Sequence, residues 1–96
     1  MPVINYGQNP IKKIRKNLDL TQEQFADELG EKLNRNLTKK DICRWEKCEH
    51  RPNREVLVAI AQIGNVDIPN FISAVKDHFE KTDKLLGRSR KYATHY

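Results

Sequence analysis

The sequence predicts an all-α protein of five helices, and three observations lead to this fold class. Apolar residues recur at intervals of three and four in five segments, which is the spacing of one helix face. No segment alternates apolar and polar residues for long enough to predict a strand. Residues typical of helix ends stand at the segment boundaries, and the length of 96 residues suits one domain.

The first helix is expected from Pro10 to about Asn17. Proline suits the first turn, where a backbone N–H would lack a partner in any case. Asn17 and Asp19 can end this helix, because both residue types tolerate the left-handed backbone conformation. The apolar face of the helix consists of Ile11, Ile14 and Leu18.

The second helix is expected after Thr21, which stands three residues before Gln24 and predicts a capping box. Gly30 interrupts the segment, so the helix either ends there or weakens and continues to about Asn34. The apolar stripe of this helix consists of Phe25, Ala26, Leu29 and Leu33.

The third and fourth helices are separated by a proline. The third is expected after Thr38, with Ile42 and Trp45 three positions apart on its inner face. Asn53 can cap the fourth helix, over residues 54–64. This fourth segment is the most apolar of the five and is expected to be the most buried.

The fifth helix is expected over residues 68–86, with Asp67 as its cap and Gly87 as its stop. Its first apolar positions are expected to complete the core, namely Ile68, Phe71, Ile72 and Val75. The stripe then continues through three distal residues, Phe79, Leu85 and Leu86. These distal residues would be exposed on a monomer and are expected to form a dimer interface. The alternative is that this end packs against Tyr6 and Val3.

Positive charge is concentrated in one part of the chain. The sequence has 18 basic and 13 acidic residues, a net charge of +5, and residues 32–54 alone contain eight basic and three acidic ones. Such an excess favours an anionic partner such as nucleic acid, although a solvated charged surface is the simpler alternative. We interpret residues 1–9 as an arm, 10–87 as the folded domain and 88–96 as a basic flexible tail.

Nothing in the sequence predicts secretion or a membrane span. No apolar run approaches the roughly 18 residues that cross a bilayer, and the first ten residues lack the pattern of a signal peptide. Two cysteines are too few for a disulfide framework. A cytoplasmic protein with reduced thiols is therefore expected.

Three segments carry a resemblance to a known family: "LTQEQFADELG", "ICRWEKCEHRPN" and "VLVAIAQIGNV". Their order, and the series Ile-x-x-Trp-Glu, Arg-Pro and Leu-x-x-Ile-Ala, resemble the helix-turn-helix family of phage repressors and Cro proteins, also called XRE-like. The resemblance covers residues 11–73. It implies a lambda-repressor-like bundle of five helices, in which the second and third form the motif and the third enters the major groove of double-stranded DNA.

The resemblance also assigns roles to residues. Trp45 would hold the third helix to the core, which is favoured over base stacking because a duplex keeps its bases covered. Glu46 would form a structural ion pair with Arg15. The base-reading positions would be Lys39, Lys40, Asp41 and Arg44. Contacts to the DNA backbone would come from Thr21, Gln22, Lys32, Arg35, Lys47, Arg51, Asn53 and Arg54.

Two of the base-reading positions have specific chemistry. Arg44 could donate to O6 and N7 of one guanine. Asp41 could accept from a cytosine, but capping its own helix is the favoured alternative. The chain departs from the family in a longer connection between the second and third helices. It also has Asp19 and Cys48 where glycine is frequent, so both positions are expected to need the backbone freedom of glycine.

Other chemistry has weaker support in the sequence. Cys43, Cys48 and His50 do not match the ligand spacing of a zinc site, so neither a metal nor another cofactor is expected. There is no Gly-rich phosphate loop and no recognisable Ser, His and Asp set, so an enzyme is not expected. An RNA-binding module would need exposed aromatic residues at stacking spacing. The sequence lacks them, so this class is not favoured.

The sequence therefore predicts a sequence-specific transcriptional regulator, a repressor or autoregulator, that binds double-stranded DNA as a homodimer. A phage or plasmid repressor, a restriction-modification controller and an antitoxin-type autorepressor all fit this description. The alternative is an antitoxin-type adaptor whose main role is to bind a partner protein, for which the tail at 88–96 is the candidate segment.

Overall fold

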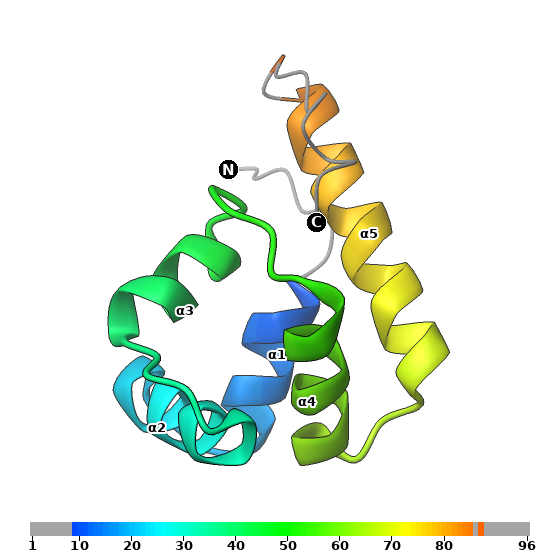
Figure 1. Cartoon of the computed structure of the whole chain (residues 1–96). Coiled ribbons are helices and arrows are strands. Elements are labelled where there is room, and N and C mark those ends of the chain that lie inside the picture. The colour runs from blue at the N-terminus through cyan, green and yellow to red at the C-terminus, as the bar shows by residue number, and fades with distance from the viewer. Residues whose placement is uncertain (1–8, 86, 88–96) are drawn as a thin grey trace.

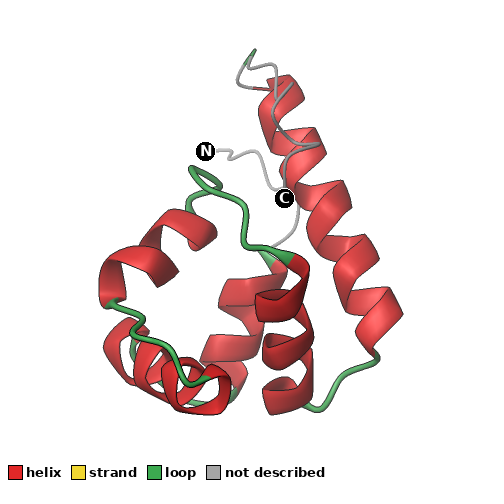
Figure 2. Cartoon of the chain, viewed as in Figure 1, coloured by secondary structure: helices red, strands yellow, loops and turns green. Residues whose placement is uncertain are grey.

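A computed structural model describes residues 9–85 and Gly87, which form five helices (Figure 1). The rest of this described part lies in turns and loops, without a strand (Figure 2). The all-α prediction is therefore confirmed. The helices are α1 (Pro10–Asn17), α2 (Gln22–Leu33), α3 (Lys39–Glu46), α4 (Arg54–Gly64) and α5 (Ile68–Leu85). The predicted tail and nearly all of the predicted arm lie outside the described residues.

Helices α1 and α4 occupy the middle of the bundle (Figure 1). Helix α5 runs along one side of this pair and contacts both helices, and α2 and α3 lie on the other side. Helix α3 contacts α2 and α1. It therefore lies at the edge of the bundle, where one of its faces is buried and the other remains open to solvent.

One apolar core joins all five helices. Every helix contributes at least one fully buried side chain, and these include Ile11, Phe25, Leu29, Ile42, Ile60, Val75 and Phe79. Burial of each large side chain contributes roughly 1.5–3 kcal/mol. Leu18 departs from its expected position and is 37% exposed, because α1 ends at Asn17 and Leu18 lies just beyond the last turn.

Helices α2 to α5 begin at the predicted capping residues. The Thr21 hydroxyl accepts a hydrogen bond from the Gln24 N–H at 3.1 Å, and the Gln24 side chain accepts one from the Thr21 N–H at 2.9 Å. These two bonds complete the capping box. Asn53 and Asp67 cap α4 and α5 by accepting from the amide three residues later, at 3.0 and 3.1 Å.

Four helices end on a non-glycine residue with a left-handed backbone. These residues are Asp19, Asn34, Cys48 and Asn65, with φ from 55° to 61°. At each one, its own N–H bonds the carbonyl three residues back, and the following N–H bonds the carbonyl five residues back. This Schellman arrangement satisfies carbonyls that a helix end leaves without partners. The expectation that Asp19 and Cys48 occupy a backbone conformation favourable to glycine is confirmed.

Gly30 allows the long connection between α2 and α3 to pack directly on α2. A Cβ at Gly30 would lie 2.6 Å from the carbonyl oxygen of Arg35. The Arg35 N–H also donates to the Gly30 carbonyl at 2.9 Å. Helix α2 continues through this glycine to Leu33, so of the two alternatives for the helix, continuation is confirmed.

The expectation that Phe79 lies exposed on a monomer is wrong. Its side chain is fully buried, and the Arg51 guanidinium carbon lies 6.0 Å from the centre of its ring. The connection between α3 and α4 covers this part of α5, because Cys48 also contacts Thr82, with 3.8 Å between sulfur and hydroxyl oxygen. The core therefore extends further along α5 than the sequence predicts.

Of the other predicted interface residues, Leu85 lies within the described part and Leu86 does not. Leu85 is 51% exposed at the end of α5, as expected for the surface of a single chain. Leu86 lies outside the described residues, and so do Tyr6 and Val3, which the alternative packing would involve.

We expect Gly30→Ala to destabilise the fold, although glycine to alanine inside a helix ordinarily stabilises it by about 1 kcal/mol. The added methyl group must displace the Arg35 backbone, and overpacking of this kind costs about 1–3 kcal/mol. Urea unfolding followed by circular dichroism measures the difference. The neighbouring exposed change Glu31→Ala is the control and should alter stability by less than about 0.5 kcal/mol. A Gly30→Ala variant as stable as the wild type would show that the connection moves aside at no cost.

Candidate nucleic-acid interface

Helix α3 has a buried apolar face and an exposed basic face. Ile42 is fully buried and Trp45 is 6% exposed, and both belong to the core. The basic residues of α3 and its C-cap are exposed, namely Lys39, Lys40, Arg44 and Lys47. The Trp45 indole therefore serves as a packing anchor beneath a positively charged surface. A partner with regularly spaced negative charges, such as a nucleic-acid backbone, suits this surface.

Asp41 is engaged at the start of α3. Its Oδ2 atom accepts hydrogen bonds from the Thr38 N–H at 2.9 Å and from the Thr38 hydroxyl at 3.3 Å. The carboxylate also lies at the positive end of the helix dipole, where a negative charge is stabilising. Asp41 therefore performs the capping role considered for it, which weakens its case as a base reader.

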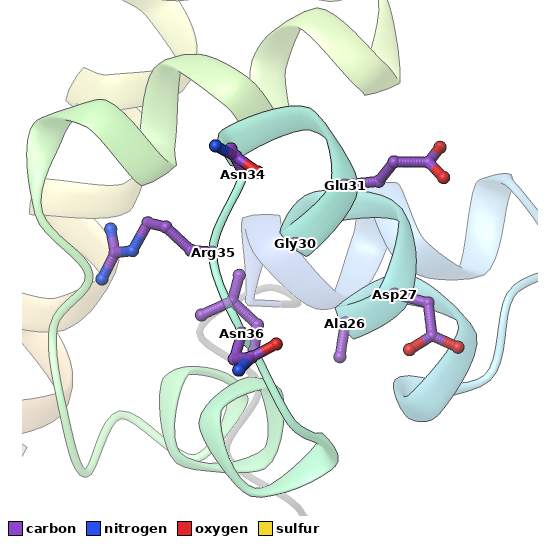
Figure 3. A pocket seen from close by; sticks show the side chains of 8 residues that line it. Ala26, Asp27, Gly30, Glu31, Asn34, Arg35 and Asn36 are labelled. Carbon is purple, nitrogen blue, oxygen red and sulfur yellow. The ribbon is translucent and has the colours of Figure 1, made fainter.

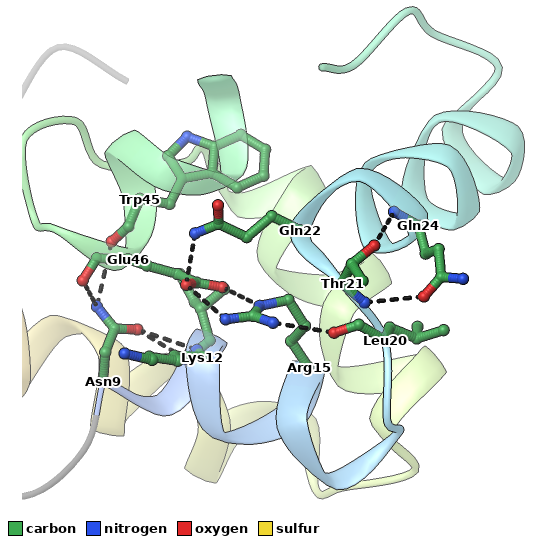
Figure 4. Close-up of polar contacts among 10 residues, drawn as sticks. Asn9, Lys12, Arg15, Leu20, Thr21, Gln22, Gln24, Trp45 and Glu46 are labelled. Atoms are coloured by element: carbon green, nitrogen blue, oxygen red, sulfur yellow. Dashed lines mark hydrogen bonds and ion pairs between the residues drawn. The ribbon is translucent and has the colours of Figure 1, made fainter. Parts of the chain in front are cut away.

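The Glu46 carboxylate connects three helices at the C-terminal end of α3 (Figure 4). Arg15 of α1 donates to it twice, from Nε to Oε2 at 2.6 Å and from Nη2 to Oε1 at 3.1 Å. Gln22 of α2 donates to the same Oε1 at 3.0 Å. The side chains of Arg15 and Glu46 are only 12% and 5% exposed. The ion pair implied by the resemblance is thus present, and it is shielded from water.

The other end of the Arg15 guanidinium fixes the turn between α1 and α2. Its Nη1 atom donates to the Leu20 carbonyl at 2.9 Å. One arginine therefore positions both the carboxylate on α3 and the chain just before Thr21, where α2 begins (Figure 4).

Asn9, which sequence reasoning missed, holds α3 from another side (Figure 4). Its buried Oδ1 atom caps α1 by accepting from the amides of Ile11 and Lys12 at 2.9 and 3.4 Å. Its Nδ2 atom donates to the carbonyls of Trp45 and Glu46, both at 3.1 Å. The Asn-Pro pair could have revealed the cap, since asparagine before a first-turn proline is typical of a helix start. The contact with α3 has no local sequence signal.

The connection between α2 and α3 borders an open hollow on α2 (Figure 3). The hollow is lined by Ala26, Asp27, Gly30, Glu31, Asn34, Arg35, Asn36 and Leu37. Arg35 lies 3.6 Å from the Glu55 carboxylate, in an exposed pair that links the connection to α4. Lys32 is exposed on the last turn of α2. Two carboxylates, Asp27 and Glu31, line the hollow, and its one arginine, Arg35, is paired with Glu55, so the hollow does not suit an anion.

The remaining candidates lie at helix starts and in the connection between α3 and α4. Thr21 is exposed at the start of α2, and Asn53 and Arg54 are exposed at the start of α4. Backbone amides at helix starts attract anions such as phosphate. Arg51 is half-buried, and the contact of its guanidinium with Phe79 ties this connection to α5.

Other chemistry finds little support within residues 9–85 and Gly87. In this part, no three His, Cys, Asp or Glu side chains lie where they could hold a metal ion together. No helix there combines the length and the apolar character needed to span a bilayer. Burial, with a smaller effect from the Lys81 charge, lowers the pKa of His78, which favours the neutral imidazole.

Comparison with known proteins places the chain in a family. A family model described as "Helix-turn-helix" matches residues 11–71. The matched segment runs from Ile11 of α1 to Phe71 of α5, so it includes every residue predicted to contact DNA, from Thr21 to Arg54, but not Asn9. No curated protein and no solved structure gives a match.

We expect the loss of Glu46 alone to cost more than the loss of the whole ion pair. Glu46→Met leaves the Arg15 guanidinium without its carboxylate, and breaking a buried pair in this way costs about 3 kcal/mol. The double variant Arg15→Met, Glu46→Met removes both charges and should recover much of that loss. Urea unfolding of the wild type, both single variants and the double variant completes the cycle. Losses that simply add would contradict a coupling between the two side chains.

Proposed function

The chain belongs to the helix-turn-helix family of XRE-like DNA-binding transcription regulators, and on this premise we propose that it represses transcription by binding a specific operator as a dimer. The observation that carries this proposal is the pair of faces on α3, with Ile42 and Trp45 in the core and basic side chains outside. The major groove of B-DNA admits one α-helix presented in this way. We call α3 the recognition helix.

Three exposed residues of the recognition helix are proposed to read bases. Lys39 and Lys40 lie on its first turn, and Arg44 follows one turn later. The Arg44 guanidinium can donate to O6 and N7 of one guanine, and the lysines can reach guanine or phosphate. Asp41 is left out of this set, because its carboxylate caps the helix.

Contacts to phosphates are proposed to fix the register of the protein on the duplex without selecting a sequence. The proposed residues are Thr21, Gln22, Lys32, Arg35, Lys47, Arg51, Asn53 and Arg54. Thr21 and Asn53 mark the starts of α2 and α4, where backbone amides add donors. Gln22 also donates to Glu46, so a phosphate contact there would be coupled to the recognition helix.

A dimer is proposed from the exposed end of α5, where Leu85 is the apolar residue at the surface. A two-fold axis would bury the same patch on both copies. Two recognition helices about 34 Å apart would then meet successive turns of the major groove. Phe79 has no part in this interface, because it belongs to the core.

Repression is the mode of regulation that needs least from the protein, because occupancy of an operator that overlaps a promoter blocks transcription. An adaptor that captures a partner protein is the alternative. It would act through residues 88–96, which lie outside the described part, and no contact within residues 9–85 favours it. The DNA-binding regulator is therefore preferred.

We expect Arg44→Ala to weaken binding to the preferred operator by about 1–3 kcal/mol while sparing random DNA, because a bidentate base contact carries that much discrimination. The operator is first selected from random duplexes, and gel-shift titrations then compare the two DNAs. Lys76→Ala, an exposed basic residue of α5 outside the proposed contacts, is the control. Equal losses on both DNAs would show that Arg44 contacts phosphate and not a base. A wild type that selects no sequence would contradict the proposed function.

The dimer can be tested at Leu85. Leu85→Lys should weaken association at least about tenfold, because a leucine leaves the interface and like charges meet across the two-fold axis. Val66→Lys is the matched control, since Val66 is also an exposed apolar residue and lies beside α5 at its other end. Sedimentation equilibrium gives the association constants. A monomeric wild type at micromolar concentration, or equal effects of the two changes, would argue against this interface.

A further inference from the structure

We propose that Asn9 is a positioning residue that sets the placement of the recognition helix for base reading, an inference that rests on the proposed function. The recognition helix has eight residues, a length of about 12 Å. Helices this short have little stability of their own in water. Where the helix lies is therefore decided by the groups that hold its two ends and its one buried face.

The two ends of the recognition helix are held differently. At the start, the capping box of Thr38 and Asp41 is formed within the helix segment itself, so it does not tie the helix to the bundle. At the C-terminal end, Arg15 and Gln22 hold the Glu46 side chain, and Asn9 holds the backbone. The C-terminal end is therefore the one that is anchored to α1 and α2 by polar contacts.

The geometry at Asn9 uses each polar atom of its side chain. The Nδ2 atom lies 3.1 Å from each of two carbonyl oxygens, those of Trp45 and Glu46, and donates to both. The sulfur of Cys48 lies 3.5 Å from the same nitrogen. A reversed amide would place its oxygen against two carbonyl oxygens, so the surroundings define the orientation of the group. One side chain therefore caps the start of α1 and the end of the recognition helix together.

A change at this joint should affect base reading more than general DNA binding. Side chains that recognise a partner must be held to within about 0.5 Å of their productive positions. A tilt of the recognition helix would move the Arg44 guanidinium away from bidentate geometry. The proposed phosphate contacts at Thr21, Asn53 and Arg54 lie outside the recognition helix and have no hydrogen bond to Asn9 among the described residues. The expected signature is a loss of discrimination between operator and random DNA, with little loss of affinity for random DNA.

Asn9→Asp tests the contact of Asn9 with the end of the recognition helix separately from its cap of α1. Aspartate keeps an oxygen for the start of α1, where it is as good a cap as asparagine, but it replaces the two N–H donors by an oxygen that faces two carbonyls. We expect the ratio of the two dissociation constants, random over operator, to fall about tenfold. The slope of log K against log salt should change little, because most of the proposed phosphate contacts lie outside the recognition helix. Asn9→Ser keeps a cap without adding a charge and should lower the ratio in the same way.

Two controls separate positioning from stability. Val75→Ala removes buried apolar atoms from α5, a helix that packs on α1 and α4. It lowers stability away from the anchored end of the recognition helix, so it should keep the wild-type ratio. Asp67→Asn exchanges carboxylate and amide at the cap of α5 and should also keep it. Binding is measured at a temperature at which circular dichroism shows each variant with wild-type helix content.

The outcomes distinguish this inference from the proposed function. A wild type that selects no operator would overturn the proposed function, and the inference with it. An operator preference that survives in both Asn9 variants, or that Val75→Ala reduces just as much, would overturn the inference alone. A reduced ratio for both Asn9 variants, with the control ratios intact, would support it.

Discussion

The arrangement of α1, α2 and α3 depends on one shielded carboxylate, that of Glu46. It accepts hydrogen bonds from Arg15 and Gln22 and belongs to α3, so each of the three helices contributes to the same cluster. A buried charge is costly unless it is paired and hydrogen-bonded. If any of these helices were displaced, the carboxylate or the guanidinium would lose partners that water cannot easily replace. The cluster therefore favours one arrangement of the helices over alternatives that bury the same apolar area.

The C-terminal end of α3 also carries the least favourable backbone conformation in the described part. Cys48 has φ of 61°, a region that costs a non-glycine residue roughly 1–2 kcal/mol, whereas Asn and Asp tolerate it better. Its N–H bonds the Trp45 carbonyl, which also accepts from Asn9. The Glu46–Arg15 ion pair, the hydrogen bonds from Asn9 and the strained backbone of Cys48 thus meet at the end of α3. Strain of this size persists only where the surrounding contacts determine the backbone. The hydrogen bonds that Asn9 and the Cys48 N–H make at this turn are contacts of this kind.

Most of the fold could be predicted because its signals are local. Helix periods, the capping box at Thr21 and the backbone at Asp19 all depend on residues within one or two turns of each other. The contacts that the sequence did not reveal join distant segments. The spacing puts Phe79 on the same face as Val75, but it cannot show how far the connection between α3 and α4 reaches over that face. For the same reason, the pattern shows Asn9 as a possible cap of α1 and says nothing of α3, which begins 30 residues later.

The long connection between α2 and α3 also becomes understandable from these contacts. A tight turn would by itself fix the orientation of two helices, whereas a longer connection does not. In the structure, the placement of α3 is determined from its opposite end, by Glu46 and Asn9. The extra residues lie against Gly30, and lengthening a loop adds only a small entropic cost. The length of the connection is thus separated from the orientation of α3, so a helix-turn-helix can lengthen its turn and still keep the geometry on which base reading depends.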